Sequence, residues 1–464
     1  MVTAYRLAIL GLALLSIIMG LVLVRMPDKV QYAMVAAIPA LLAGAYALIN
    51  PFAGVWMFML MDYLRPYTFI PALRPLRLGI LTVAVTLFSW IVHQAINKEK
   101  VRWHPTATWF LVFLLVIAMG VLTAANNFRA YMVLEGMLTT FVMFLLVVNI
   151  VKTTQQLKLV VWLVLLIHLY YAIKGIYNFA FVGISYAGLV TSGSVGSSFI
   201  SDENDFALAL NAMIPFAFFL FMREKSKFKK FFLLGTMLAL VLGVVASQSR
   251  GGVIGLAVVT LFCMIKSKQK LISMVIVGML CLSVIVFAPS SYWSEVKSIT
   301  RTDEGTANSR INYWKAAVRM YLDYPIIGVG AGNGPVRMPE YVTGFSDPNT
   351  QWGRTFHGNF PLIIAELGSL GLIAYVAMLI LSFRALIKIQ RQYSGDHKSL
   401  EWSIASAIAV GMLGWLTSAT FLSVTFYPHL WTLHALTVVL YLCSKPQARA
   451  SAPAPTPGLP SAGA

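Results

Sequence analysis

The chain repeats one feature that restricts its fold more than any other: apolar runs about as long as a bilayer is thick. Its 464 residues are 59% hydrophobic and only 11% charged, and the mean hydropathy is +0.77. A membrane-spanning helix needs roughly 20 apolar residues, and soluble globular proteins do not have this balance. The sequence therefore predicts an all-α, polytopic bundle of about 12–14 transmembrane helices.

One apolar run is too short to cross a bilayer as a straight helix. Residues Phe52–Leu64 would rise only ~20 Å, which predicts a tilted half-span or a re-entrant segment. The other expected spans are Tyr5–Val24, Val30–Ile49, Leu78–Asn97, Ala107–Ala125, Arg129–Ile150, Leu157–Phe179, Asn204–Met222, Phe231–Ser247, Gly252–Ile265, Leu271–Ala288, Asn359–Ile387, Trp402–Leu422 and Pro428–Cys443.

This pattern divides the chain into four parts. Residues 1–288 are expected to form transmembrane helices with short loops, and residues 289–358 form one long, partly helical outer loop. Residues 359–445 return to transmembrane helices. The tail 446–464 is rich in Pro, Ala, Ser and Gly, which is typical of a disordered segment, and it is expected on the cytoplasmic side.

The basic residues divide the loops between two sides of the membrane. One side carries 14 Lys and 6 Arg, and the other carries 4 Lys and 11 Arg. The positive-inside rule makes the Lys-rich side cytoplasmic, so the net charge of +18 does not indicate nucleic-acid binding. A guanidinium binds phosphate bidentately, which predicts an outer face built to hold phosphate. The alternative is compositional drift with ordinary ion pairs.

Arg250 lies in a tight outer turn, Ser247–Gly252, between two apolar runs. A cation at such a place is costly unless it has a partner. We interpret it as an anion ligand whose neighbouring glycines let backbone and ligand approach closely. The alternative is that Arg250 extends to the lipid headgroups.

A second basic residue opens an amphipathic helix in the long outer loop. Asn308 or Ser309 is expected to cap this helix, which places Arg310 in the first turn, where the helix dipole already attracts anions. An apolar stripe is expected to serve packing or interfacial anchoring, and it comprises Ile311, Trp314, Val318 and Tyr321.

His357 combines a polar outer loop, a flanking Arg354 and the start of an apolar run. An imidazole that titrates near neutrality suits proton abstraction from a hydroxyl. Glu366 follows on the same expected helix and needs a partner there, either the helix that carries His357 or an Arg.

Three other groups have simpler interpretations. The glycine-rich segment 328–334 follows a helix rather than a strand, which favours a flexible structural turn over a nucleotide site. The acidic segment 201–205 suits a helix N-terminus, with metal binding as the alternative, and no metal site is predicted. The cysteines lie in apolar runs and are expected to pack there: Cys263, Cys281 and Cys443.

In this order the motifs resemble the O-antigen ligase/polymerase superfamily of bacterial inner-membrane glycosyltransferases. The resemblance covers roughly residues 200–390. Arg65-Pro66 resembles the branch of O-glycosylation ligases found with exosortase systems. The motifs that carry the superfamily resemblance are Ser249-Arg250-Gly251, Arg310…Trp314…Pro325…Gly328-Val329-Gly330, and His357 followed by Asn359, Glu366, Gly368 and Gly371.

The resemblance implies transfer of a glycan from undecaprenyl diphosphate to an acceptor hydroxyl on the periplasmic face, without metal or other cofactor. His357 would be the base, and Arg250 and Arg310 would bind the diphosphate. The acceptor would be a lipid or a glycan, with lipid A core among the candidates. The residues expected to contact substrate are Arg65, Arg74, Arg77, Asn204, Trp314, Arg354, Asn359 and Glu366.

Three other functions remain open at this stage. A polysaccharide polymerase of the same superfamily would use a repeat unit as acceptor. A transporter or flippase of lipid-linked glycans would need coupling carboxylates, for which Asp62 and Glu135 are the candidates in or near apolar runs. A non-catalytic assembly subunit would bind the lipid without turnover.

Overall fold

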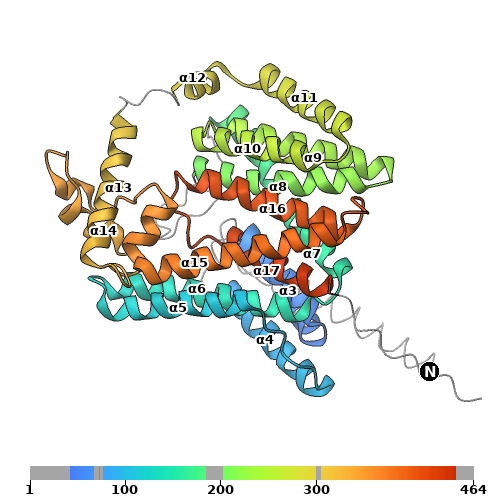
Figure 1. Ribbon diagram of the computed structural model, residues 1–464, viewed down its shortest axis with the longest axis horizontal. Helices are drawn as coiled ribbons and strands as arrows, with labels where there is room; N and C mark the ends of the chain where they lie inside the picture. The colour runs from blue at the N-terminus through green and yellow to red at the C-terminus, as the bar shows by residue number, and fades with distance from the viewer. Residues whose placement is uncertain (1–41, 67–72, 74–76, 184–201, 299–304, 446–464) are drawn as a thin grey trace, which may run out of the picture.

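The computed structural model describes residues 42–66, 73, 77–183, 202–298 and 305–445, and most of its helices lie side by side along one direction (Figure 1). Nine helices in these ranges are long and apolar enough to cross a membrane. The described chain contains helices and no strand. The predicted all-α polytopic fold is confirmed, while Tyr5–Val24, most of Val30–Ile49 and the tail 446–464 lie outside the described residues.

The helices fall into three groups by length and position. The candidate spans are α4 (Leu78–Asn97), α5 (Pro105–Thr123), α6 (Asn127–Ile150), α7 (Thr154–Tyr177) with its π-helical extension η4 (Asn178–Val182), α8 (Glu203–Arg223), α9 (Lys227–Ala246), α11 (Lys270–Phe287), α15 (Asn359–Gln392) and α16 (Leu400–Ala419). Shorter helices accompany them: α3 (Pro51–Met59) with the π-turn η1 (Leu60–Leu64), α10 (Arg250–Lys266) and α17 (Pro428–Cys443). Between α11 and α15 lie α12 (Ser290–Ser298), α13 (Gly305–Asp323), α14 (Gly334–Tyr341) and the 3-10 turn η5 (Pro348–Gln351).

Hydrogen bonds join loops that the sequence assigns to the same side. At one end Arg102 Nη1 donates to the Val151 carbonyl over 3.1 Å. At the other end the Asn126 N–H donates to Asn333 Oδ1 over 2.7 Å, linking the α5–α6 turn to the long loop. These contacts match the predicted partition of the loops. The assignment of the second end to the periplasm stays a prediction.

The most deeply buried candidate spans are α8 and α16. In an apolar 18-residue stretch of each helix, 89% and 83% of the residues lie inside the protein. Glycine lets their neighbourhood pack tightly: a Cβ on Gly411 of α16 would lie 2.7 Å from the Ala212 carbonyl oxygen of α8. Such small residues let helix backbones approach closely where the hydrophobic effect cannot drive association. The bundle is therefore centred on α8 and α16, and the other helices surround them.

The α15 helix is broken inside its span. Gly368 has φ 61° and ψ −160°, which no helix tolerates. The segment Pro325–Gly330 runs into this break and exchanges backbone hydrogen bonds with it, which satisfies groups that the break would leave unpaired. These bonds run from Val329 N to Ala365 O (2.8 Å), Gly330 N to Glu366 O (3.1 Å), Ser369 N to Pro325 O (2.8 Å) and Leu370 N to Ile326 O (3.1 Å).

The glycines at this junction are required by contact as well as by conformation. A Cβ on Gly328 would lie 2.3 Å from the carbonyl carbon of Glu366, and one on Gly368 would lie 2.5 Å from that of Ile326. The glycine-rich segment is structural, as predicted, but its backbone is bonded to α15. The expectation that it is a flexible turn is therefore wrong.

We predict that Gly328→Ala destabilises the protein strongly, because both the positive φ and the clash with the α15 backbone must be relieved. Overpacking of this kind costs roughly 1–3 kcal/mol, and a strained φ costs a further ~1 kcal/mol or more. Thermal unfolding in detergent measures the effect. The matched control is Gly353→Ala, since Gly353 has φ 84° but a Cβ there meets nothing within 4 Å. Equal losses in the two variants would show that the backbone junction contributes little.

Candidate active site

Arg250 is the first residue of α10, at the outer turn between α9 and α10. Ser249 caps this helix: its Oγ accepts from the Gly252 N–H over 3.0 Å and donates to Asn204 Oδ1 over 2.7 Å. The second bond ties the start of α10 to the start of α8. Arg250 is thus held at a helix N-terminus, where a cation is unfavourable for the helix dipole and an anion is favoured.

The glycines that follow Arg250 serve helix packing. A Cβ on Gly252 would lie 2.5 Å from the Ala207 Cβ of α8, whereas one on Gly251 would make only ordinary contacts with Phe421, at 3.7 Å and beyond. Gly252 therefore lets α10 approach α8, and this contact positions Arg250. For Gly251, close approach of a ligand to the backbone stays a prediction.

The helix that carries Arg310 begins earlier than predicted. It starts at Gly305, so Asn308 and Ser309 lie inside it and Arg310 is in its second turn. The predicted cap is wrong, and the argument from the first turn applies to Arg250 instead. The predicted apolar stripe does not pack as a whole, because Ile311 and Val318 are exposed, and its alternative role as an interfacial anchor stays a prediction. The face packed into the protein is formed by Tyr313, Ala316, Ala317 and Met320.

Two aromatic residues of α13 hold the turn that carries His357. The Tyr313 hydroxyl donates to Gln351 Oε1 over 2.8 Å, and its ring centre is 6.2 Å from that of the His357 imidazole. The Trp314 indole Nε1 donates to the Phe356 carbonyl over 3.1 Å. His357 itself has φ 48°, a left-handed conformation that a residue with a side chain keeps only when its surroundings impose it.

Arg310 lies close enough to both Arg250 and His357 to interact with each of them electrostatically. Burial lowers the pKa of the Arg310 guanidinium, and the positive charge of Arg250 lowers this pKa further. Burial also lowers the pKa of His357 below 6.5, followed by the charge of Arg310. Such like-charge contacts are unfavourable unless an anion is present. Within the described residues, the half-buried Arg310 guanidinium makes no hydrogen bond or ion pair, which leaves its donors available to a ligand.

Asp202 also belongs to this group, although the sequence did not predict that it would lie near His357. Its Oδ1 caps α8 by accepting from the N–H groups of Asn204 and Asp205, at 2.8 and 3.1 Å. Its negative charge raises the pKa of His357, against the lowering by burial and Arg310. The sequence predicted an acidic segment at a helix N-terminus, but it contained no signal that α8 would begin beside a loop more than 150 residues away.

The described histidines other than His357 have structural partners. His168 and His429 are buried and share an Nε2···Nε2 contact of 3.1 Å, and the Val164 carbonyl lies 2.7 Å from His168 Nδ1. His357 makes no hydrogen bond through its ring within the described chain, so its nitrogens are open to a substrate. The remaining histidines interact through Ser382 (His434), Ser89 (His93), Thr106 (His104) and Trp402 (His397).

The predicted substrate-binding residues separate into those near His357 and those with other partners. Arg354 is exposed and its charge lowers the pKa of His357. Asn204 is linked to Arg250 by the hydrogen bond that its neighbour Ser249 donates to Asn204 Oδ1. Asn359 is buried, with Nδ2 donating to the Tyr375 hydroxyl (2.9 Å) and Oδ1 accepting from Thr425 Oγ1 (2.7 Å). This geometry gives Asn359 a structural role.

Glu366 also has a structural role. Its side chain is buried, and its two oxygens accept from the N–H groups of Gly332 (2.7 Å) and Gly334 (3.1 Å). It therefore fastens the glycine-rich segment, and neither the helix of His357 nor an Arg is its hydrogen-bonding partner. Because both carboxylate oxygens are engaged, this geometry does not support the predicted contact with substrate.

Of the predicted basic loop 65–77, the described arginines, Arg65 and Arg77, have partners other than His357. Arg65 Nε donates to the Asp62 carbonyl over 3.1 Å, and the guanidinium lies close enough to His429 to interact with it electrostatically. Arg77 is exposed and forms an ion pair with Glu135 of α6 at 3.3 Å. Arg74 lies outside the described residues. A part for these arginines in substrate binding stays a prediction.

The fold and this site together define a class: a multi-pass helical membrane protein with a cationic, imidazole-containing site where the ends of α8, α10 and α15 meet α13. Residues 235–376 match the protein family described as O-antigen ligase. This match confirms, over residues 235–376, the resemblance to the O-antigen ligase/polymerase superfamily that was read from the motifs. The match includes Arg250, Arg310 and His357 but not Asp202 or Arg65. A comparison with curated proteins finds no match.

We predict that the pKa of His357 lies below 6.5 and moves in opposite directions in two variants. Asp202→Asn removes a negative charge that favours the imidazolium, so the pKa falls further. Arg310→Gln removes a positive charge that opposes it, so the pKa rises. The pH dependence of carbethoxylation at His357, followed by peptide mass spectrometry, measures both shifts. His93, on α4, serves as the internal control, and shifts of the same sign in both variants would contradict the assignment.

Proposed function

We propose that this protein is an inverting glycosyltransferase that moves a glycan from undecaprenyl diphosphate to an acceptor hydroxyl on the periplasmic face of the bacterial inner membrane. The observation that carries the proposal is the convergence of Arg250, Arg310 and His357 at one end of the bundle. The O-antigen ligase match supports it, since glycan transfer of the ligase or polymerase type is the activity of that family.

The two guanidiniums suit the donor diphosphate. Arg250 and Arg310 interact repulsively with each other, and a diphosphate between them would turn this repulsion into attraction. Negative charge on the diphosphate grows as its bond to the sugar breaks, so fixed positive charge stabilises the transition state more than the ground state. In this mechanism the guanidiniums supply the charge that a divalent metal provides in other transferases.

His357 suits the acceptor hydroxyl. Burial and Arg310 lower the pKa of His357, which favours the neutral imidazole that can accept a proton. The acceptor oxygen attacks the anomeric carbon from the side opposite the diphosphate, its proton passes to a His357 ring nitrogen, and undecaprenyl diphosphate leaves with the bonding electron pair. Attack from the opposite side inverts the anomeric configuration.

Asp202 completes the charge balance of this step. When His357 gains the proton, an imidazolium forms beside Arg310 and Arg354, which is unfavourable. The Asp202 carboxylate is the group whose charge favours the imidazolium, and the N–H groups of α8 hold it in place. We infer that Asp202 lowers the energy of the protonated base without touching the substrate.

Two alternatives use the same fold differently. A polymerase would apply the same chemistry with a glycan repeat unit as acceptor, so only the acceptor distinguishes it from a ligase. A proton-coupled flippase would need carboxylates free to titrate in the bundle. Glu135 pairs with Arg77 at 3.3 Å, which makes it a poor coupling group, whereas Asp62 stays a candidate for that role.

We predict that His357→Ala and Arg310→Ala leave the protein inserted in the membrane but abolish transfer. Loss of a general base lowers the rate roughly 10²–10⁴-fold, and loss of a charge that stabilises the transition state lowers it roughly 10²–10³-fold. The assay uses purified protein, undecaprenyl-diphosphate-linked glycan, and either lipid A core or a repeat unit as acceptor, with the glycosidic product as readout.

The controls replace the same residue types away from the site. His93→Ala changes a histidine whose ring contacts the Ser89 carbonyl of its own helix. Arg391→Ala changes an exposed arginine in the last turn of α15. Both are expected to keep normal transfer. Unchanged transfer in His357→Ala and Arg310→Ala would refute the mechanism, and lipid translocation without product would favour the flippase.

A further inference from the structure

The end of the bundle opposite His357 carries two cations gathered around one aromatic ring. Tyr441 lies in the last turn of α17, and the ammonium of Lys388, from α15, is 5.6 Å from the centre of its ring. The ammonium of Lys445, which follows α17, is 5.2 Å from the same centre. Both distances are in the range of cation–π interactions. One ring therefore holds two positive charges from different segments close together.

Contacts between distant segments fix the position of this ring. Gln392 Nε2, at the end of α15, donates to the Ser444 carbonyl over 2.8 Å, which ties the ends of α15 and α17 together. His104, at the start of α5, packs against Tyr441 with ring centres 5.4 Å apart and ring planes at 70°. The tyrosine is thus held by the tertiary structure and not only by its own helix.

The cluster has no anionic partner within the described chain. Lys388 and Lys445 are exposed and form no hydrogen bond or ion pair there, and the Tyr441 hydroxyl makes no hydrogen bond. Glu99, an acidic residue at the same end, pairs with Lys152 instead. Like charges that are gathered without a counter-charge are unfavourable, and a bound anion stabilises them.

An exposed apolar stripe on α15 leads to this cluster. α15 extends from the end of the bundle near α13 to the opposite end (Figure 1). The side chains of the stripe share one face of the helix, and each is at least 39% exposed: Leu370, Ile373, Ile380 and Ile387. Lys388 follows directly after the last of them. A ligand that matches both features has an apolar chain and an anionic head.

We propose that this cluster binds the phosphate of an anionic phospholipid whose acyl chains lie along the apolar stripe of α15. The Tyr441 hydroxyl donates to the phosphate, and the ammoniums of Lys388 and Lys445 neutralise it. The lysine-rich loops assign this end to the cytoplasmic side, where anionic lipids attract basic segments. The inference is independent of the transfer reaction.

The surroundings favour a lipid over a soluble phosphate ion. Tyr and Trp are enriched where a membrane meets water, with their rings at the level of the headgroups. Besides Tyr441, this end carries Trp103, which is next to His104 and exposed. A free phosphate ion would use the cations but leave the stripe on α15 uncovered, whereas a phospholipid uses both.

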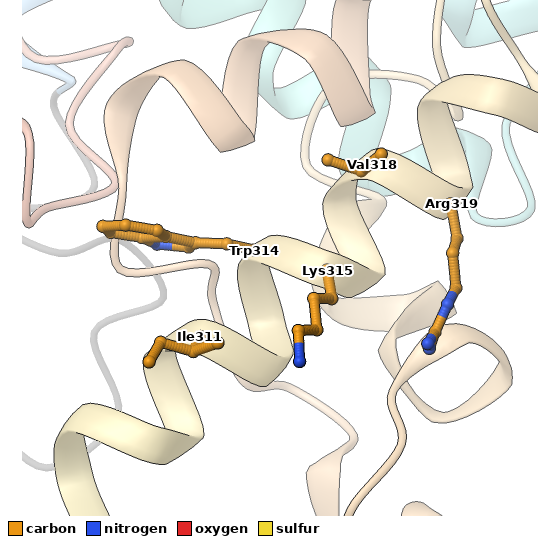
Figure 2. A pocket seen from close by; sticks show the side chains of 5 residues that line it. All are labelled: Ile311, Trp314, Lys315, Val318 and Arg319. Carbon is orange, nitrogen blue, oxygen red and sulfur yellow. The ribbon is translucent and has the colours of Figure 1, made fainter.

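The cations on α13 do not form a comparable cluster. Figure 2 shows Lys315 and Arg319 extending from a single helix. Arg319 Nη1 already donates to the Tyr341 carbonyl over 2.8 Å and to Thr343 Oγ1 over 3.1 Å. Within the described chain, neither cation makes a cation–π contact. Exposed cations alone therefore do not reproduce the arrangement around Tyr441.

The test measures the Kd of phosphatidylglycerol for the delipidated, full-length protein in detergent by native mass spectrometry. Phosphatidylcholine with the same acyl chains is the reference lipid without net charge. We expect the wild-type protein to bind phosphatidylglycerol more tightly. Lys388→Gln and Lys445→Gln each raise its Kd roughly fivefold, because each removes one charge beside the phosphate, and Lys388→Arg keeps the wild-type value.

A variant without a change of charge tests the hydroxyl. Tyr441→Phe keeps the ring and both cation–π contacts but removes the donor to the phosphate. It raises the Kd of phosphatidylglycerol roughly threefold and leaves that of phosphatidylcholine unchanged. Diffuse attraction between a basic surface and an anionic lipid predicts no such effect, since it depends on charge alone.

The matched control is Lys230→Gln. The Lys230 ammonium lies 5.5 Å from the ring centre of Phe221, at the end of the bundle that the loops assign to the cytoplasm. Within the described chain it is the one cation over that ring, and phenylalanine has no hydroxyl. This variant is expected to keep the wild-type Kd. Thermal unfolding without added lipid shows whether each variant is folded.

Three outcomes overturn the inference. The first is a wild-type protein that binds phosphatidylglycerol and phosphatidylcholine equally. The second is a folded Lys388→Gln or Tyr441→Phe variant with an unchanged Kd for phosphatidylglycerol. The third is a loss in Lys230→Gln as large as that in Lys388→Gln, which would assign the binding to the general positive charge of this end.

Discussion

The exchange of backbone hydrogen bonds between the broken α15 and the segment Pro325–Gly330 is the constraint on which the rest of the site depends. It fixes the end of α13 against the middle of α15, while Glu366 fastens the following glycines. The other end of this part of the chain is the turn that begins α15. With both ends held, α13 presents Arg310, Tyr313 and Trp314 to His357.

This arrangement concentrates positive charge at one end of the bundle. Arg250 reaches the site because α10 packs tightly on α8 through Gly252. Arg310 reaches it from α13. Mutual repulsion disfavours the two charges, and burial also disfavours that of Arg310. A bound anion would relieve this cost, in keeping with the proposed diphosphate donor.

The catalytic candidates could be predicted because their chemistry is local. Arg250 in a turn between spans, Arg310 in an outer helix and His357 before a span each have a residue type and a position that point to anion binding or proton transfer. The structure brings all three into electrostatic contact. Asp202 could not be predicted as their partner, because an N-capping carboxylate is the same in sequence wherever its helix begins. Asn359 and Glu366 belong to the same motif, but Asn359 bonds the side chains of Tyr375 and Thr425, and Glu366 bonds the backbone of Gly332 and Gly334.

The periodicity of α13 shows why a sequence pattern fails to orient a helix. Ile311, Trp314, Val318 and Tyr321 form the more obvious apolar stripe, yet α13 packs through Tyr313, Ala316, Ala317 and Met320. Small residues contribute less than large ones to a hydrophobicity count, but they allow α15 to approach α13 closely.

Composition and run length determined by themselves that the chain forms a polytopic helical bundle, because each helix must satisfy its own backbone in the membrane. The division of the loops between two ends followed from the distribution of Lys and Arg. Tertiary structure decided the break in α15, the face that α13 buries and the position of Asp202. Each of these depends on contacts between segments distant in the chain, which no local pattern encodes.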